Sequence, residues 1–123
     1  MNYSKIIFGI CILLLLDFLW ISLFMNNKYK ILVENIQKEK FTLNIYSAVM
    51  AYLFMVVGLI MIVIKYKLSY IDTFIFGIVI YGVYDFTCGA IFKNWDFKLA
   101  ILDILWGGFL FTITNYLINL IIF

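Results

Sequence analysis

The stretch Tyr81–Asp96, YGVYDFTCGAIFKNWD, decides how the chain is organised, because it places a carboxyl group inside an apolar segment. That group belongs to Asp85, and Lys93 and Trp95 follow just past the end of the segment. Two other apolar segments carry an Asp with a Trp three residues later, namely Asp17 with Trp20 and Asp103 with Trp106. The pattern predicts a chain that holds three Asp side chains together.

The composition indicates that lipid surrounds most of this chain. Of its 123 residues, 67% are hydrophobic and only 13% are charged, whereas about 25% are charged in a soluble domain. The chain has no His, which excludes a histidine-based metal site and a Ser-His-Asp triad, and we expect no metal or cofactor. A net charge of +2 is too small for nucleic-acid binding. We therefore expect the lipid bilayer as a partner and no nucleic acid.

Four apolar segments reach the length of about 20 residues that a membrane-spanning helix needs. They are Ile6–Met25, Leu43–Ile64, Leu68–Phe92 and Leu99–Phe123. Since hydrocarbon offers no hydrogen bonds to the backbone, each segment is predicted to be a helix. Short connections make neighbouring helices antiparallel. The predicted fold class is therefore all-α, a four-helix antiparallel transmembrane bundle that forms one integral membrane domain over residues 1–123.

The first connection, Asn26–Thr42, is the only long one. Its apolar residues Tyr29, Leu32, Val33 and Ile36 are spaced i, i+3, i+4, i+7, and polar residues occupy the other angles. This spacing predicts an amphipathic helix of about two or three turns that lies at the membrane surface. A solvated loop with some apolar residues is the alternative.

The distribution of Lys near the ends of the spans predicts the orientation of the protein. Six Lys lie on the side of the first and third connections and three on the other side: Lys28, Lys30, Lys38, Lys40, Lys93 and Lys98 against Lys5, Lys65 and Lys67. The excess predicts that both termini are outside and that the first and third loops are cytoplasmic.

The three Asp residues have similar predicted depths. Asp17, Asp85 and Asp103 lie nine, eight and five residues from the nearest of these two connections, so a rise of about 1.5 Å per residue gives depths of about 13, 12 and 8 Å. Each Asp costs about 2.5–3.5 kcal/mol at the centre of a membrane helix. This cost favours a proton, cation or substrate site. The alternative is that the three are protonated or hydrogen-bonded contacts between helices.

Aromatic and polar side chains accompany the three Asp residues. Each Trp three residues after an Asp shares its helix face, and Tyr81 and Cys88 flank Asp85 at i−4 and i+3. The predicted site comprises Asp17, Trp20, Tyr81, Tyr84, Asp85, Thr87, Cys88, Lys93, Trp95, Asp103 and Trp106.

These motifs resemble those of a family of small bacterial membrane proteins, domain of unknown function 2177, whose members have four predicted spans. The family pattern has Asp-x-Leu-Trp in the first helix, Tyr-Asp-Leu-Thr-Asn and Lys-x-Trp-Pro around the third, and Asp-x-x-Trp-Gly in the fourth. The matching residues are Asp17, Trp20, Tyr84, Asp85, Thr87, Lys93, Trp95, Asp103, Trp106 and Gly107, whereas Cys88 and Asp96 stand where the family has Asn and Pro. The resemblance covers nearly the whole chain and implies no particular activity.

Three functions fit these observations. The favoured one is proton- or cation-linked transport or permeation through the intramembrane Asp/Trp/Tyr site, in a homo-oligomer because four short spans enclose little space. The second is a membrane-embedded enzyme that modifies a lipid, with Asp85 or Asp103 as general base and Lys93 on a headgroup phosphate. The lack of His and of a nucleophile motif makes an enzyme the weaker candidate. The third is a non-catalytic scaffold or accessory subunit.

Overall fold

The structure is a computed structural model that describes residues 3–39 and 44–121. These residues form helices and no strand, in the order α1 (Tyr3–Trp20), η1 (Ile21–Met25), α2 (Asn26–Gln37), α3 (Ile45–Gly58), η2 (Leu59–Ile64), α4 (Tyr70–Ile91) and α5 (Phe97–Ile121). The segments η1 and η2 are π-helical and continue α1 and α3. The predicted all-α bundle is confirmed.

Within the described residues, four helical stretches are long and apolar enough to cross a membrane: Tyr3–Met25, Ile45–Ile64, Tyr70–Ile91 and Phe97–Ile121. Their ends differ from the predicted ends by no more than three residues. Two predicted ends, Leu43 and Phe123, lie outside the described residues, and so does Lys40 in the first connection. Hydropathy alone therefore located all four stretches.

Side-chain caps fix where three of the helices begin. Asn44, Ser69 and Asp96 precede α3, α4 and α5, and each accepts a hydrogen bond from a backbone N–H of the first turn, at 3.2, 3.1 and 2.9 Å. Such a cap stabilises a helix by about 1 kcal/mol. The turns before α4 and α5 contain Lys67 and Asn94 with left-handed φ values of 50° and 61°, which reverse the chain within a few residues.

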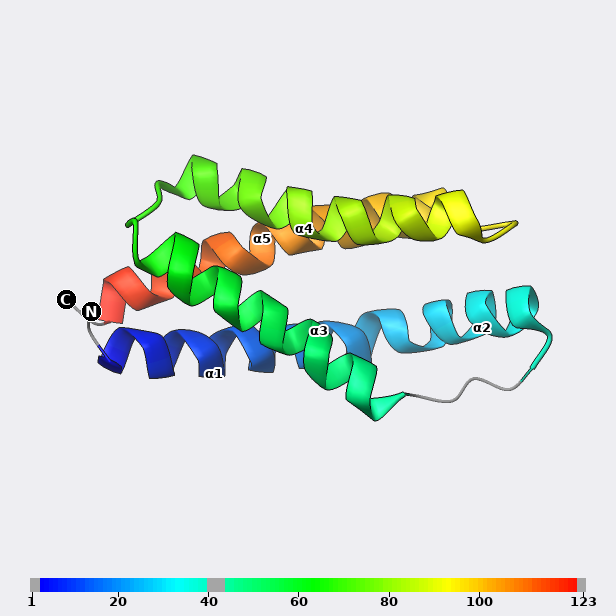
Figure 1. Ribbon diagram of the computed structural model, residues 1–123, viewed down its shortest axis with the longest axis horizontal. Coiled ribbons are helices and arrows are strands. Elements are labelled where there is room, and N and C mark those ends of the chain that lie inside the picture. The colour runs from blue at the N-terminus through cyan, green and yellow to red at the C-terminus, as the bar shows by residue number, and fades with distance from the viewer. Residues whose placement is uncertain (1–2, 40–43, 122–123) are drawn as a thin grey trace.

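The helices run lengthwise, and both termini lie at one end of the bundle (Figure 1). We call this end the terminal face. It also carries the turn between η2 and α4, whereas the opposite end, the loop face, carries α2 and the connection between α4 and α5 (Figure 1). α3 crosses the bundle at an angle (Figure 1). The first and third connections therefore share one face, as the antiparallel arrangement predicts.

The amphipathic helix expected in the first connection is present as α2, which ends where Lys38 adopts a left-handed φ of 61°. It continues the direction of α1 through η1 (Figure 1). The apolar residues at its predicted spacing, Tyr29, Leu32, Val33 and Ile36, are half-buried. Its position at a membrane surface stays a prediction.

The tightest packing joins α4 to α5. A Cβ atom on Gly77 would collide with the carbonyl oxygen of Gly107 and lie 2.8 Å from Cα of Gly108. A Cβ atom on Gly107 would overlap the ring of Tyr81. Small residues allow two membrane helices to approach at backbone distance, and here that approach also sets the position of the Tyr81 ring.

An apolar core fills the half of the bundle nearer the terminal face. Leu59, Val63 and Phe111 are buried there, and the ring of Phe76 packs edge-on against Phe111 with 5.3 Å between centroids. In contrast, large apolar side chains such as Leu23, which is 81% exposed, cover the outside of the bundle. A helix that is apolar all round belongs in a hydrocarbon surrounding.

A separate polar contact lies close to the terminal face. Asn115 of α5 is buried, and its Nδ2 donates hydrogen bonds to the carbonyl of Leu68 at 3.1 Å and to the hydroxyl of Thr73 at 3.0 Å. This contact ties α5 to the start of α4. Thr73 and Tyr81 are eight residues apart on α4, so the apolar core between them is about 12 Å deep at about 1.5 Å per residue.

Candidate functional site

All four spans contribute a side chain to one carboxyl group, that of Asp17 on α1. Oδ1 of Asp17 accepts a hydrogen bond from the hydroxyl of Tyr81 on α4 at 2.8 Å and another from Nε1 of Trp106 on α5 at 3.0 Å. The hydroxyl of Tyr52 on α3 lies nearby and interacts with Asp17. The carboxyl group of Asp17 is therefore a point at which side chains of all four spans meet.

The carboxyl groups of Asp85 on α4 and Asp103 on α5 are neighbours, close enough for a hydrogen bond between them when one of them is protonated. Asp85 is 0% exposed and Asp103 is 7% exposed, so water does not solvate either one. No N–H or hydroxyl of the described residues donates to Oδ2 of Asp85. A carboxylate only accepts hydrogen bonds, so a hydrogen bond between two carboxyl groups requires a proton on one of them.

Two indole rings connect the carboxyl pair to Asp17. Trp20 donates from Nε1 to Oδ1 of Asp103 at 3.4 Å, and its ring stacks on that of Trp106 with 4.6 Å between centroids and 5° between planes. Phe24 stacks on Trp20 at a centroid distance of 4.6 Å. An indole donates one hydrogen bond and accepts none. The stack therefore holds the carboxyl groups in place without offering a path for a proton.

The loop-face end of the site is covered by α2. The hydroxyl of Tyr29 donates to Oδ1 of Asp85 at 3.0 Å, and its ring lies 5.9 Å from that of Trp95. Burial raises the pKa of the Tyr29 phenol, and the nearby carboxyl groups of Asp103 and Asp85 raise it further. Tyr29 therefore stays protonated and donates to Asp85 at every physiological pH.

Trp95 lies in the connection between α4 and α5 and is buried. Its indole N–H has no hydrogen-bond partner among the residues that the structure describes. Residues 3–39 and 44–121 contain no group of three or more His, Cys, Asp or Glu side chains that could hold a metal ion.

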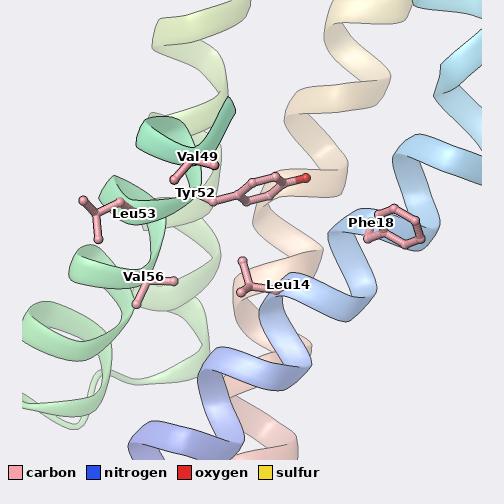
Figure 2. A pocket seen from close by; sticks show the side chains of 6 residues that line it. All are labelled: Leu14, Phe18, Val49, Tyr52, Leu53 and Val56. Carbon is pink, nitrogen blue, oxygen red and sulfur yellow. The ribbon is translucent and has the colours of Figure 1, made fainter. Parts of the chain in front are cut away.

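An apolar groove opens on the outside of the bundle between α1 and α3, with a volume of about 470 Å³. Its lining residues are Leu14, Phe18, Val49, Tyr52, Leu53 and Val56. The side chain of Tyr52 reaches from α3 across the space towards α1, with its hydroxyl at the far end (Figure 2). Because that hydroxyl lies next to Asp17, Tyr52 separates the groove from the network of carboxyl groups.

Comparison with known proteins places the chain in a family. The model of the DUF2177 family, described as a predicted membrane protein, matches residues 3–119. The chain belongs to the DUF2177 family. Together with the four candidate spans, membership makes it a multi-pass integral membrane protein that sits in a lipid bilayer. Searches of curated proteins and of solved structures gave no significant match.

The residues that carry the DUF2177 pattern do not all enter the network. The structure brings six of the predicted site residues together in it: Asp17, Trp20, Tyr81, Asp85, Asp103 and Trp106. Trp95 lies next to it through Tyr29.

The other predicted residues lie at the edge. Tyr84 is exposed and lies beside Cys88, and Thr87 and Lys93 are exposed. Tyr84 and Thr87 are one residue before and two residues after Asp85, and such positions point away from it on a helix of 3.6 residues per turn. At the second departure from the family pattern, Asp96 caps α5, which a Pro side chain cannot do.

Sequence reasoning missed two donors. Tyr29 was assigned only to the apolar face of a surface helix, and Tyr52 was not singled out. Tyr52 lies seven residues into α3, about 10 Å along the helix at about 1.5 Å per residue, which is the depth of the three Asp residues. The same depth measurement, applied to hydroxyl groups as well as carboxyl groups, would have found it.

Proposed function

We propose that the protein is a proton-linked membrane transporter, in which the carboxyl pair Asp85 and Asp103 binds and releases the proton. The observation that supports this best is the closeness of the two buried carboxyl groups, which allows them to share one proton. Such a pair holds a proton between its members. Among the described residues no cation forms an ion pair with either one, so the charge of the pair changes when the proton leaves. Intramembrane carboxyl groups of this kind serve proton relays.

The three carboxyl groups have different parts in this proposal. Tyr29 reaches Asp85 from the loop face, so it is the first group that a proton entering from that side meets. The indole stack keeps Asp17 close to the pair, and hydrogen bonds from Tyr81 and Trp106 hold the Asp17 side chain in place. Of the other predicted residues, Cys88 and Lys93 would lie beside the entrance, whereas Tyr84 and Thr87 point away from Asp85.

The apolar core favours a carrier over an open channel. The network lies towards the loop face, and about 12 Å of apolar packing separates Tyr81 from Thr73 at about 1.5 Å per residue. A proton or substrate therefore needs a change of conformation to reach the terminal face. In the predicted orientation the network lies nearer the cytoplasmic face, beneath α2. A homo-oligomer remains part of the proposal because four spans enclose little space.

A specific observation favours a second candidate, a membrane-embedded enzyme that acts on a lipid. The apolar groove leads from the outside of the bundle to Tyr52, whose hydroxyl lies next to Asp17. In this case Asp85 or Asp103 would act as general base, and Lys93 would lie near a headgroup phosphate. Lipid mass spectrometry of cells that express the protein tests this candidate, since new lipid species are expected only for an enzyme.

The transport proposal is tested by proton flux into liposomes that contain the purified protein and an enclosed pH-sensitive dye. We expect an imposed pH gradient to collapse faster than in empty liposomes. Asp85→Asn removes the proton-binding group but keeps its size, so we expect flux to fall to the level of empty liposomes. Asp72→Asn is the matched control, because Asp72 is exposed at the start of α4, far from the pair. Equal flux in the two variants would exclude the pair as the proton site.

If the wild-type protein and both variants behave like empty liposomes, the transport proposal fails. The absence of new lipid species in the same cells would then leave the third function considered, a scaffold or accessory subunit.

A further inference from the structure

The groove between α1 and α3 has the properties of a site for a hydrocarbon chain. Five of its six lining residues are apolar, and the hydroxyl of the sixth, Tyr52, is turned away towards Asp17 (Figure 2). Its volume of about 470 Å³ lies within the range of about 300–1,000 Å³ typical of ligand sites. No charged side chain lines it. A polar ligand would make no hydrogen bond there, whereas a methylene chain has no hydrogen bonds to lose.

The position of the groove selects a chain from one leaflet. Val49 is four residues and Val56 eleven residues into α3, so the groove extends from about 6 to about 17 Å along the helix from its loop-face end, at about 1.5 Å per residue. One leaflet contributes about half of a hydrocarbon core that is about 30 Å thick. The groove thus runs along the acyl region of the leaflet at the loop face.

We propose that this groove binds one acyl chain of a phospholipid from that leaflet, and that the chain rests on the ring of Tyr52. Two spans bound the groove, so the molecules that reach it in a bilayer are lipids. The bound chain would lie one side chain away from Asp17, and the groove would be the lateral entrance through which a lipid-like substrate approaches the carboxyl network. The role of the groove as an entrance rests on the proposed function. The binding of an acyl chain in the groove does not depend on that function.

The binding is tested with the full-length protein in nanodiscs whose phospholipid carries a diazirine in the middle of its acyl chain. After illumination, mass spectrometry maps the labelled residues. We expect the labels to gather on Leu14, Phe18 and Leu53, above the level on the outward faces of α4 and α5. Equal labelling of all four spans would show only the ordinary lipid surroundings and would overturn the proposal.

Variants that fill the groove sharpen the test. Val56→Trp places an indole in the part of the groove nearer the terminal face. Val49→Trp places one in the part nearer the loop face without disturbing the core, because Val49 is 58% exposed. We expect either variant to abolish the excess labelling. Val79→Trp on α4 is the control, since Val79 is 55% exposed and lies outside the groove. If Val56→Trp fails to fold, Val49→Trp decides the question, and unchanged labelling in it contradicts the proposal.

The variant Asp85→Asn separates this inference from the transport proposal. We expect its groove to be labelled as in the wild type, because Asp85 does not line the groove. Excess labelling of a wild-type protein that carries no protons would keep the acyl-chain site and reject transport. Proton flux with no excess labelling would keep the transport proposal and reject the acyl-chain site.

Discussion

The three buried Asp residues differ in the hydrogen bonds that surround them. Asp17 accepts hydrogen bonds from the phenol of Tyr81 and the indole of Trp106, and the hydroxyl of Tyr52 lies nearby. Asp85 accepts from one phenol and Asp103 from one indole, and the two carboxyl groups lie next to each other. Charge without a partner is costly in a buried position. For this reason the transport proposal places the exchangeable proton on the pair.

The proton that we propose for the pair would have a spectroscopic signature. We expect the infrared spectrum of the protein in lipid to contain a band of a protonated carboxyl group at neutral pH. Asp85→Asn and Asp103→Asn are each expected to shift or remove that band, because either one breaks the pair. Asp72→Asn is expected to leave it unchanged, since Asp72 is exposed. A spectrum with only ionised carboxylates would contradict a hydrogen bond between Asp85 and Asp103.

Much of the candidate site could be predicted from spacing alone. The rise of a helix converts sequence position into depth, and it gave similar depths to the three Asp residues, whose side chains the structure joins in one network. What spacing could not give is which side chains turn towards one another. Tyr29 and Tyr52 enter the network because α2 continues α1 and α3 leans across the bundle. This arrangement of the helices is a property of the tertiary structure and leaves no local pattern in the sequence.

The helices show a similar division between what the sequence predicts and what it leaves open. Runs of apolar residues predicted the four spans and their ends. The π-helical segments η1 and η2 were not predicted, because an i to i+5 hydrogen bond has no distinctive residue composition. The end of the first span at Met25 was correct as a boundary of hydropathy. The helix itself goes on into α2, since Asn26 and Asn27 do not break a helix as Pro does.

The backbone contact between α4 and α5 predicts a strong effect of one methyl group. Gly77→Ala forces a Cβ atom against the carbonyl of Gly107, and overpacking of this kind costs about 1–3 kcal/mol. We expect a lower midpoint in a detergent unfolding titration. Gly82→Ala on the same helix is the control, because a Cβ there meets nothing within 4 Å, and its midpoint is expected to be unchanged or higher. Equal effects of the two substitutions would contradict the close approach.

The molecule as a whole has two unlike halves between its faces. Towards the loop face lie the three carboxyl groups with their phenols and indoles, and towards the terminal face lies the apolar core around Phe111. Hydropathy could not predict this division, because both halves of every span are apolar on average. Nor does the fold determine which face is cytoplasmic, and for this the Lys distribution gives the only prediction.

The sidedness is tested by labelling single cysteines in a variant that lacks Cys11 and Cys88. Lys38→Cys lies at the end of α2 and Lys5→Cys in the first turns of α1, so they belong to opposite faces. We expect an impermeant thiol reagent added to intact cells to label Lys5→Cys and to spare Lys38→Cys until the membrane is opened. The reverse result would invert the orientation, and labelling of both in intact cells would contradict the topology.

The apolar core has a consequence for how the protein responds to membrane voltage. A potential of 100 mV acts on one elementary charge with about 2.3 kcal/mol over the whole membrane. Most of this drop is expected to fall across the dry packing between Tyr81 and Thr73 rather than across the polar half. A proton that reaches the carboxyl pair from the loop face then crosses little of the electric field, whereas one released to the terminal face crosses most of it. Proton binding to the pair would then depend on the pH at the loop face. Proton release to the terminal face would depend on the voltage across the membrane.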